Sequence, residues 1–206
     1  MADISIGVAS HNIHLVKGAD MTGYLGRNSG AEGVHDPLKI KCVLFDDGVQ
    51  RSALIVCDLL ALSDDFIKDV TSRAETVTNL KSENIVIACT HTHSGPASIF
   101  LRDCGIVNNK WLEELKSTIL ECLLDAFGNI EKCIIKYHTG YSDINCNRDT
   151  IDEAVRNSLR DNQVGVLTIY RQSDCSIKTM LVNYACHPTS LLDNNLLYSA
   201  DYVFYL

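Results

Sequence analysis

Short strand-like runs alternate along this sequence with two segments of helical periodicity, and this alternation decides the fold class. Apolar and β-branched residues gather in runs of strand length. These runs lie at residues 4–9, 38–45, 52–59, 84–89, 132–138, 164–170 and 177–184. Turn residues at 46–48 and 172–175 join neighbouring runs into hairpins. Strands followed by helices, together with hairpins, predict an α/β fold with a mixed β-sheet sandwich and flanking helices.

Both predicted helices show the apolar stripe of a helix that packs on a core. Ser63 precedes the first helix as its N-cap, followed by two aspartates where the helix dipole favours negative charge. The second helix spans residues 109–127, with a wide apolar face, and Gly128 is expected to end it. The 206 residues, 46% of them hydrophobic, suffice for one sizeable core. We therefore expect a single domain over residues 1–206.

Charge and composition exclude several classes of partner and location. The chain has 26 acidic and 18 basic residues and a net charge of −8. Nucleic-acid binding needs clustered Lys and Arg, so we expect no nucleic-acid partner. No apolar run reaches the roughly 18 residues of a transmembrane helix, and the start does not resemble a secretion signal. Nine cysteines without CxxC spacing favour reduced thiols and a cytoplasmic location over a disulfide framework.

Three histidines follow the ends of two strand-like runs. His91 and His93 come just after the run at 84–89, and His187 follows a strand-like segment that ends at Ala185. In an extended chain, residues two apart point to the same side, so His91 and His93 are expected to present both imidazoles to one point. Neutral imidazoles favour Zn²⁺, which acidifies a bound water and polarises a carbonyl. The alternative is that these are ordinary core or surface histidines.

Other residues offer weaker candidates for the same site. Cys89 lies two residues before the first of these histidines and is either a soft metal ligand or a packed strand residue. Ser94 and Ser190 lie outside any Gly-x-Ser-x-Gly elbow, which disfavours a serine nucleophile. An acid such as Asp58 or Asp20 would complete an unrelated zinc hydrolase site. Surface or ordinary strand positions are expected for His11, His14 and His138.

Several motifs, in one order along nearly the whole chain, carry a resemblance to a known family. They are Gly23-Tyr24, Gly33-Val-His-Asp-Pro-Leu38, Thr90-His-Thr-His-Ser-Gly-Pro96, Asn145-Cys-Asn-Arg148, Ala185-Cys-His-Pro-Thr-Ser190 and Asn195-Leu-Leu-Tyr-Ser-Ala-Asp201. In these motifs the sequence resembles the amino-terminal portion of the neutral/alkaline non-lysosomal ceramidases. The resemblance implies a zinc-dependent hydrolase of sphingolipid metabolism, in which activated water attacks the amide of an N-acyl sphingoid base. Its partner would then be a lipid amide or another small-molecule amide.

The resemblance also assigns roles to individual residues. It maps metal ligands of the family onto His91 and His187, and a histidine of the active-site wall onto His93. Arg148 corresponds to an arginine that lines the site and suits a developing oxyanion. The family completes its site with a Glu, a Tyr and a Gly-Asp-Val-Ser-Pro-Asn element that have no counterpart in this sequence. We therefore expect the site and the domain to be incomplete in this chain.

The final residues, 195–206, are rich in leucine and aromatic side chains. Because an exposed apolar run invites self-association, we expect it to be covered. A missing carboxyl-terminal half, a second copy of the chain or docking on its own core would each do this. A non-catalytic zinc- or lipid-binding remnant of the same fold is the alternative to a hydrolase, since zinc sites need three or four protein ligands.

Overall fold

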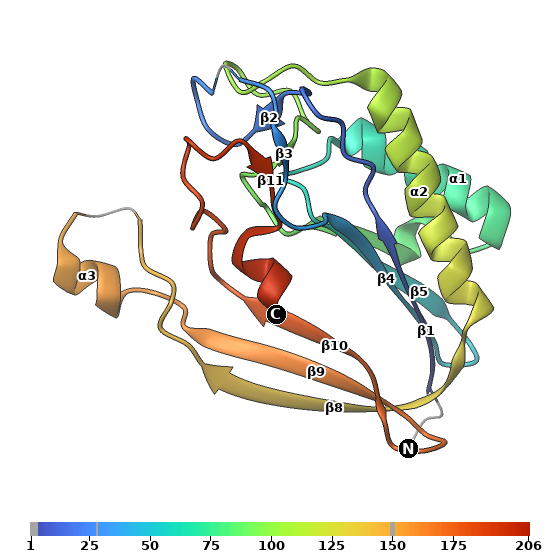
Figure 1. Cartoon of the computed structure of the whole chain (residues 1–206). Coiled ribbons are helices and arrows are strands. Elements are labelled where there is room, and N and C mark those ends of the chain that lie inside the picture. Colours follow the sequence, from blue (N-terminus) through green and yellow to red (C-terminus); the bar gives the residue numbers. More distant parts are fainter. Residues whose placement is uncertain (1–3, 28, 149–150) are drawn as a thin grey trace. The chain divides into compact units, whose positions relative to one another are not determined.

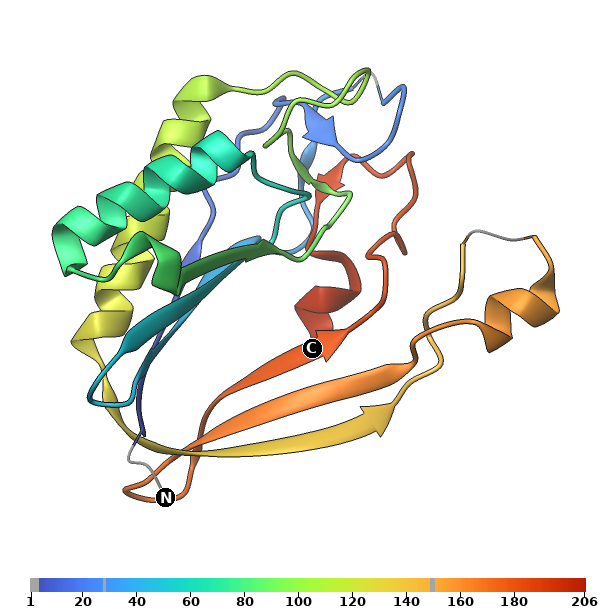
Figure 2. The ribbon, with the colours of Figure 1, turned by 180° about the vertical axis from the view of Figure 1, so that it is seen from behind.

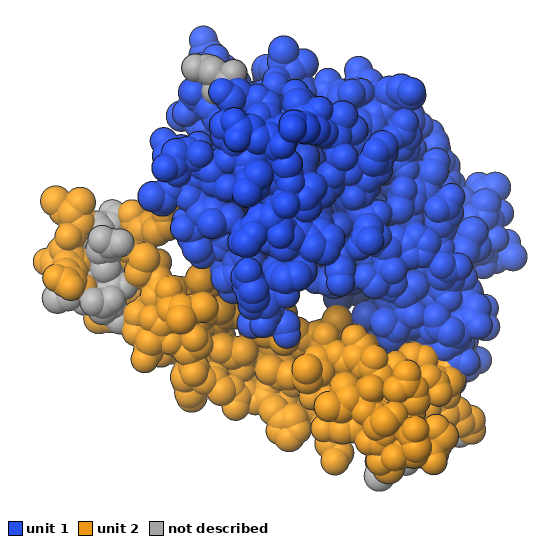
Figure 3. Space-filling view, viewed as in Figure 1, with its two compact units in different colours: residues 1–130, 188–206 blue, residues 131–187 orange. Residues whose placement is uncertain are grey.

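The computed structural model describes residues 4–27, 29–148 and 151–206. The chain divides into unit 1, residues 1–130 with 188–206, and unit 2, residues 131–187 (Figure 3).

Unit 1 is built on a mixed sheet whose strands lie in the order β1-β4-β5-β6 (Figure 1). These strands are β1 (Ile4–Asn12), β4 (Lys39–Asp46), β5 (Arg51–Cys57) and β6 (Ile85–Cys89). The first three pair antiparallel, whereas β6 runs parallel to β5. The parallel pair brings the carboxyl ends of β5 and β6 to the same edge of the sheet, with Cys57 opposite Cys89. That edge carries the candidate site.

Two helices, α1 (Asp64–Thr78) and α2 (Asn109–Gly128), lie together over one face of this sheet (Figures 1 and 2). The predicted cap of α1 is confirmed, because Ser63 Oγ accepts a hydrogen bond from the Phe66 amide at 3.2 Å. The buried face of α2 is formed by Trp111, Leu115, Ile119, Cys122, Leu123 and Ala126. Among the described residues, no helix has the length and apolar character needed to cross a membrane.

Two very short ladders join the loops of unit 1. Strand β2 (Met21–Thr22) pairs antiparallel with β7 (Gly95–Pro96), and β3 (Gly33–Val34) pairs parallel with β11 (Leu197–Tyr198). The 3₁₀ segments are η1 (Ser82–Asn84) and η2 (Asp201–Tyr205). Ladders of two residues leave no periodic pattern in a sequence, so the sequence analysis did not identify either of them.

Unit 2 is an antiparallel sheet with strand order β8-β9-β10 and a short helix. Its elements are β8 (Glu131–Tyr141), α3 (Glu153–Ser158), β9 (Gln163–Arg171) and β10 (Ile177–Tyr184). The predicted hairpin at 172–175 is confirmed, with the Arg171 amide donating to the Ser176 carbonyl at 2.8 Å. The fold class is therefore α/β with mixed sheet and flanking helices, as the sequence predicted.

The apolar final segment is partly covered by the core of unit 1. Tyr198 and Ala200 are fully buried, and the Tyr198 hydroxyl donates to the Val16 carbonyl at 3.0 Å. Tyr205 and Leu206 are exposed. Docking on the chain's own core thus accounts for the first part of this segment.

The α2 interface should dominate the stability of unit 1. Ile119 is fully buried, so Ile119→Ala should lower the free energy of unfolding by about 2–5 kcal/mol through lost burial and a residual cavity. Leu124→Ala, on the exposed side of the same helix, should change it by only about 0.5 kcal/mol. Urea unfolding followed by Trp111 fluorescence measures both. Equal losses would show that α2 does not pack as described.

Candidate metal centre

The loop after β6 leaves the extended conformation at once. The Thr90 amide donates to the Cys57 carbonyl at 3.0 Å and the His91 amide to the Leu59 carbonyl at 2.9 Å. His91 itself has a left-handed backbone, with φ 69°. The prediction that an extended chain aligns His91 and His93 is therefore wrong, because a turn separates them. The turn nevertheless brings their ring centroids to 5.2 Å, with the ring planes at 76°.

His91 is held in the tautomer that a metal site requires. Its Nδ1 lies 2.8 Å from the Leu60 carbonyl oxygen. A carbonyl oxygen only accepts hydrogen bonds, so Nδ1 carries the proton and Nε2 keeps its lone pair. Metal-binding histidines characteristically make this kind of hydrogen bond through their second ring nitrogen. The surroundings of His91 therefore fit a metal ligand.

Residues 23–27 form a clamp around His93, which we call the Gly23–Arg27 clamp. Gly23 has φ 115°, and a Cβ there would lie 2.7 Å from the His93 ring. The Tyr24 ring meets the imidazole edge-on at 5.0 Å between centroids. Arg27 Nη1 donates to the His93 carbonyl at 2.9 Å. The ring and the main chain of His93 are thus both positioned by one segment.

Polar side chains tie the histidine loop to the last segment of unit 1. Thr92 Oγ1 donates to the Ser199 carbonyl at 2.6 Å, and the Ser199 amide donates to the Ser94 carbonyl at 3.0 Å. Asn195 Nδ2 donates to Ser94 Oγ at 3.0 Å. Ser94 is buried and engaged in these contacts, so its hydroxyl supports the structure and a nucleophilic role stays disfavoured.

Two buried carboxylates hold the segment that follows His187. Asp36 accepts a hydrogen bond from Ser199 Oγ. Asp201 accepts from Ser190 Oγ at 2.6 Å and from the Leu191 amide at 3.0 Å. The Ser190 hydroxyl is therefore a donor in this network and helps to hold the segment in place. All five residues belong to unit 1, so they fix this part of the chain within that unit.

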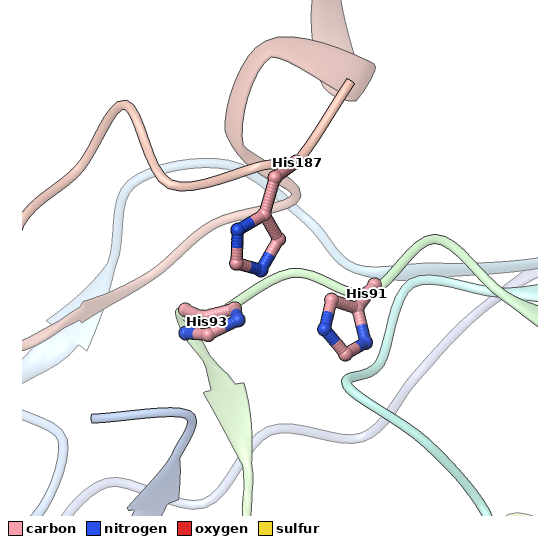
Figure 4. A group of neighbouring side chains, drawn as sticks. All are labelled: His91, His93 and His187. Atoms are coloured by element: carbon pink, nitrogen blue, oxygen red, sulfur yellow. The ribbon is translucent and has the colours of Figure 1, made fainter. Parts of the chain in front are cut away.

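His187 stands where the chain passes from unit 2 into unit 1. It is bonded to Pro188, and it precedes the pinned Ser190 by only three residues. Tyr24, which contacts His93, also donates to the Leu191 carbonyl at 2.8 Å. His187 is thus linked through the backbone to the segment around Leu191, which the Gly23–Arg27 clamp contacts. Among the described residues, the one group of His, Cys, Asp and Glu side chains suited to hold a metal ion is His91, His93 and His187 (Figure 4).

Arg148 lies beside His187 within unit 2. Its Nη1 is 3.5 Å from His187 Nε2, the outer limit of a hydrogen bond, and its side chain is exposed. Asn145 Nδ2 donates to the Ala185 carbonyl at 2.8 Å, which ties the loop that carries Arg148 to the end of β10. The structure thus brings together the arginine and the second histidine motif singled out in the sequence.

The weaker ligand candidates do not belong to this group. Cys89 packs against the core, and burial raises the pKa of its thiol to about 12. Asp58 is buried and accepts from the Lys39 amide at 3.0 Å. Asp20 accepts from the Ile106 amide at 2.8 Å. These side chains therefore have structural roles, and the unrelated hydrolase site closed by an aspartate lacks support.

The other histidines considered lie apart from the candidate centre. His11 Nε2 pairs with Asp125 at 2.7 Å, and His14 Nδ1 with Glu114 at 3.3 Å. His138 is an exposed residue of β8. They occupy the surface and strand positions expected from the sequence.

Comparison with known proteins now places the chain in a family. Residues 5–205 match the family described as neutral/alkaline non-lysosomal ceramidase, N-terminal. This chain belongs to that family. A solved ceramidase complexed with C2 has the same fold at a TM-score of 0.85 and 20% identity. A neutral ceramidase from Pseudomonas aeruginosa matches at a TM-score of 0.83 and 21% identity. Both alignments cover 98% of this chain and 34% of the solved chain, so this ceramidase-family chain spans about a third of their length.

The sequence analysis missed the residues that hold the segments around the three histidines in place. Arg27, Asp36 and Asp201 were not identified, although Asp36 and Asp201 stand inside the motifs that carried the resemblance. Their role depends on partners about 160 or only 10 residues away, such as Ser199 for Asp36 and Leu191 for Asp201. The available signal was an acid inside each of two of the motifs that carried the resemblance.

The Gly23–Arg27 clamp predicts a specific effect of removing its glycine. Gly23→Ala should shift the His93 ring resonances, because the new Cβ would overlap the imidazole. Gly26→Ala is the matched control, since Gly26 also has a positive φ but open space around its Cβ position. Both should lose about 1–2 kcal/mol of stability from backbone strain. Only Gly23→Ala should move His93 in heteronuclear NMR spectra. Identical spectra for the two variants would rule out the clamp.

The buried carboxyl of Asp58 should make the free energy of unfolding depend on pH in a definite direction. Burial raises the pKa of its carboxyl above 3.8, with Lys41 at 3.7 Å opposing the rise. The folded chain then keeps this proton where the unfolded chain has lost it, so the contribution of Asp58 to stability falls as pH rises from 3.8 through the raised pKa. The free energy of unfolding of the parent minus that of Asp58→Asn should follow this fall in urea titrations. A difference that grows with pH would mean that Lys41 outweighs burial.

Proposed function

We propose that this chain carries the metal-binding part of a zinc hydrolase that cleaves the amide bond of N-acyl sphingoid bases or closely related lipid amides. The observation that carries the proposal is the group of His91, His93 and His187 in a member of the ceramidase family. The titles of the solved relatives name ceramidases, and ceramide hydrolysis is extended to this chain as part of the proposal.

The donor set of the three histidines suits zinc. Imidazole nitrogens are preferred ligands of Zn²⁺, and catalytic zinc sites use three protein ligands with one position open. His91 and His187 are the ligands implied by the resemblance, and His93 would supply the third in place of a role in the wall. Support for His93 comes from its 5.2 Å ring distance to His91 and from the clamp that fixes it. The Leu60 carbonyl supports His91 by holding its Nδ1 proton.

The chemistry of the site would combine the ion with residues of the chain. A bound zinc supplies a Lewis acid and lowers the pKa of water toward about 7. Arg148, next to His187, would place positive charge where the carbonyl oxygen of the amide becomes negative. That interaction strengthens only as charge develops, so Arg148 should act on kcat more than on substrate binding.

Metal affinity tests the ligand assignment. His91→Ala, His93→Ala and His187→Ala should each weaken zinc binding at least tenfold, because each removes one of three ligands. Competition with a fluorescent chelator provides the affinity. His11→Ala and His138→Ala, two histidines outside the group, serve as controls and should bind like the parent. Unchanged affinity in any of the first three would remove that residue from the ligand set.

Turnover tests the hydrolase itself. The zinc-loaded chain should release a fluorescent fatty acid from an N-acyl sphingosine at least tenfold faster than His91→Ala. We expect the rate to be slow, since the described group of ligands includes no acid to accept a proton. Release should stop with a chelator and return with zinc. Zinc binding with a rate equal to that of His91→Ala would favour the non-catalytic, zinc-binding alternative.

A further inference from the structure

Arg27 contacts both of the loops that lead to the proposed metal ligands. One loop carries His93, and the other, residues 188–195, follows His187 directly. Arg27 Nη1 donates to the His93 carbonyl at 2.9 Å, and Arg27 Nε donates to the Asp193 carbonyl at 3.3 Å. One guanidinium therefore joins main-chain atoms of two loops that lie far apart in the sequence.

Neighbouring contacts fix Arg27 itself. Its guanidinium lies over the Tyr24 ring, at 4.9 Å from the ring centroid. The Tyr24 hydroxyl in turn donates to the Leu191 carbonyl at 2.8 Å, in the second of the two loops. The Gly26 amide donates to the Asp103 carbonyl at 3.1 Å, which anchors the main chain just before Arg27. The arginine is thus held firmly enough to act as a bridge between the loops.

This bridge depends on the planar fork of an arginine. Two nitrogens of one guanidinium reach two carbonyls while its flat face stacks on a ring, and the single ammonium of a lysine cannot reproduce that arrangement. Hydrogen bonds from a charged donor are also about twice as strong as those between neutral groups. Arg27 should therefore hold the two loops more firmly than a neutral side chain of similar length.

The position of this charge is unfavourable apart from the bridge. Burial lowers the pKa of the Arg27 guanidinium, and the nearby Asp193 carboxylate opposes that change. Among the residues that the structure describes, Arg27 Nη2 is buried and has no hydrogen-bond partner. Burying a charge and a donor without a partner destabilises a fold. The bridge between the two loops is the feature that explains why an arginine lies here.

The bridge acts on the proposed metal centre through the main chain. It holds the His93 carbonyl on one side and, on the other, a carbonyl in the loop that begins directly after His187. The groups that orient metal ligands strongly influence how tightly a site binds its metal. Without the bridge the two loops should move independently, which would speed the release of an ion whose ligands lie on both sides.

We propose that Arg27 is a positioning residue that fixes the spacing of the two ligand loops and so slows the release of zinc. The proposal rests on the proposed function for the identity of the metal and its ligands. It goes beyond the orientation of His93 by the Gly23–Arg27 clamp, because it couples His93 to the loop that follows His187.

The rate of zinc release tests this role. Stopped-flow mixing of the zinc-loaded chain with an excess of a chromogenic chelator measures it. Arg27→Met, which removes the guanidinium, should release zinc at least tenfold faster than the parent. Arg27→Lys keeps the charge but loses the fork, and should release zinc at least fivefold faster. The matched control is Arg102→Met, which removes an arginine whose side chain is 92% exposed, and it should stay within twofold of the parent.

Two results of this experiment would overturn the proposal. Zinc release from Arg27→Met at the rate of the parent would show that the bridge does not hold the ligands. Parent-like release from Arg27→Lys would show that a positive charge alone is sufficient, without a connection between the loops.

Amide hydrogen exchange of the metal-free chain separates this proposal from the proposed function. Arg27→Met should speed exchange both in residues 91–95 and in residues 188–195, whereas α2 should exchange as in the parent. This result needs no zinc, so a failure of the proposed function would leave it intact. Faster exchange throughout unit 1, including α2, would show a general loss of stability and overturn the positioning role. Faster exchange in only one of the two loops would overturn the bridge.

Discussion

The parallel pairing of β5 with β6 is the interaction on which the candidate centre depends. It places the ends of both strands at one edge, where main-chain hydrogen bonds continue past Cys89 and turn the chain at His91. The same turn brings the Leu60 carbonyl to His91 Nδ1 and so selects the metal-binding tautomer. A parallel pair needs a crossover between its strands, and α1 lies in that crossover. The crossover between β5 and β6 therefore supplies both the α1 part of the core and the strand ends that carry the site.

Polar side chains fix the segments around the histidines that the sheet alone does not hold. Asp36 and Asp201 connect the final segment of unit 1 to the rest of the unit, and the Gly23–Arg27 clamp fixes His93. Burying a carboxylate is costly unless hydrogen bonds compensate it, and both aspartates accept such bonds. The two buried aspartates have a clear purpose if the histidines must keep one geometry, since metal ligands depend on the groups that orient them.

Much of the fold could be predicted from the sequence, because long elements leave periodic patterns. The apolar face of α2 and the cap at Ser63 are local signals, and both are confirmed. The turn at His91 could not be predicted, because a strand-end histidine with positive φ looks like any extended residue. The two-residue ladders and the Asp36–Ser199 contact join residues far apart in sequence, which local patterns do not reveal. The cytoplasmic location and the absence of a nucleic-acid partner stay predictions.

X-ray absorption spectroscopy of the zinc-loaded chain tests the central claim most directly. We predict a first shell of nitrogen and oxygen at about 2.0–2.1 Å, with the outer-shell scattering of three imidazoles. His93→Ala should reduce the imidazole count to two. A shell that contains sulfur at about 2.3 Å, or fewer than three imidazoles in the parent, would contradict the three-histidine site.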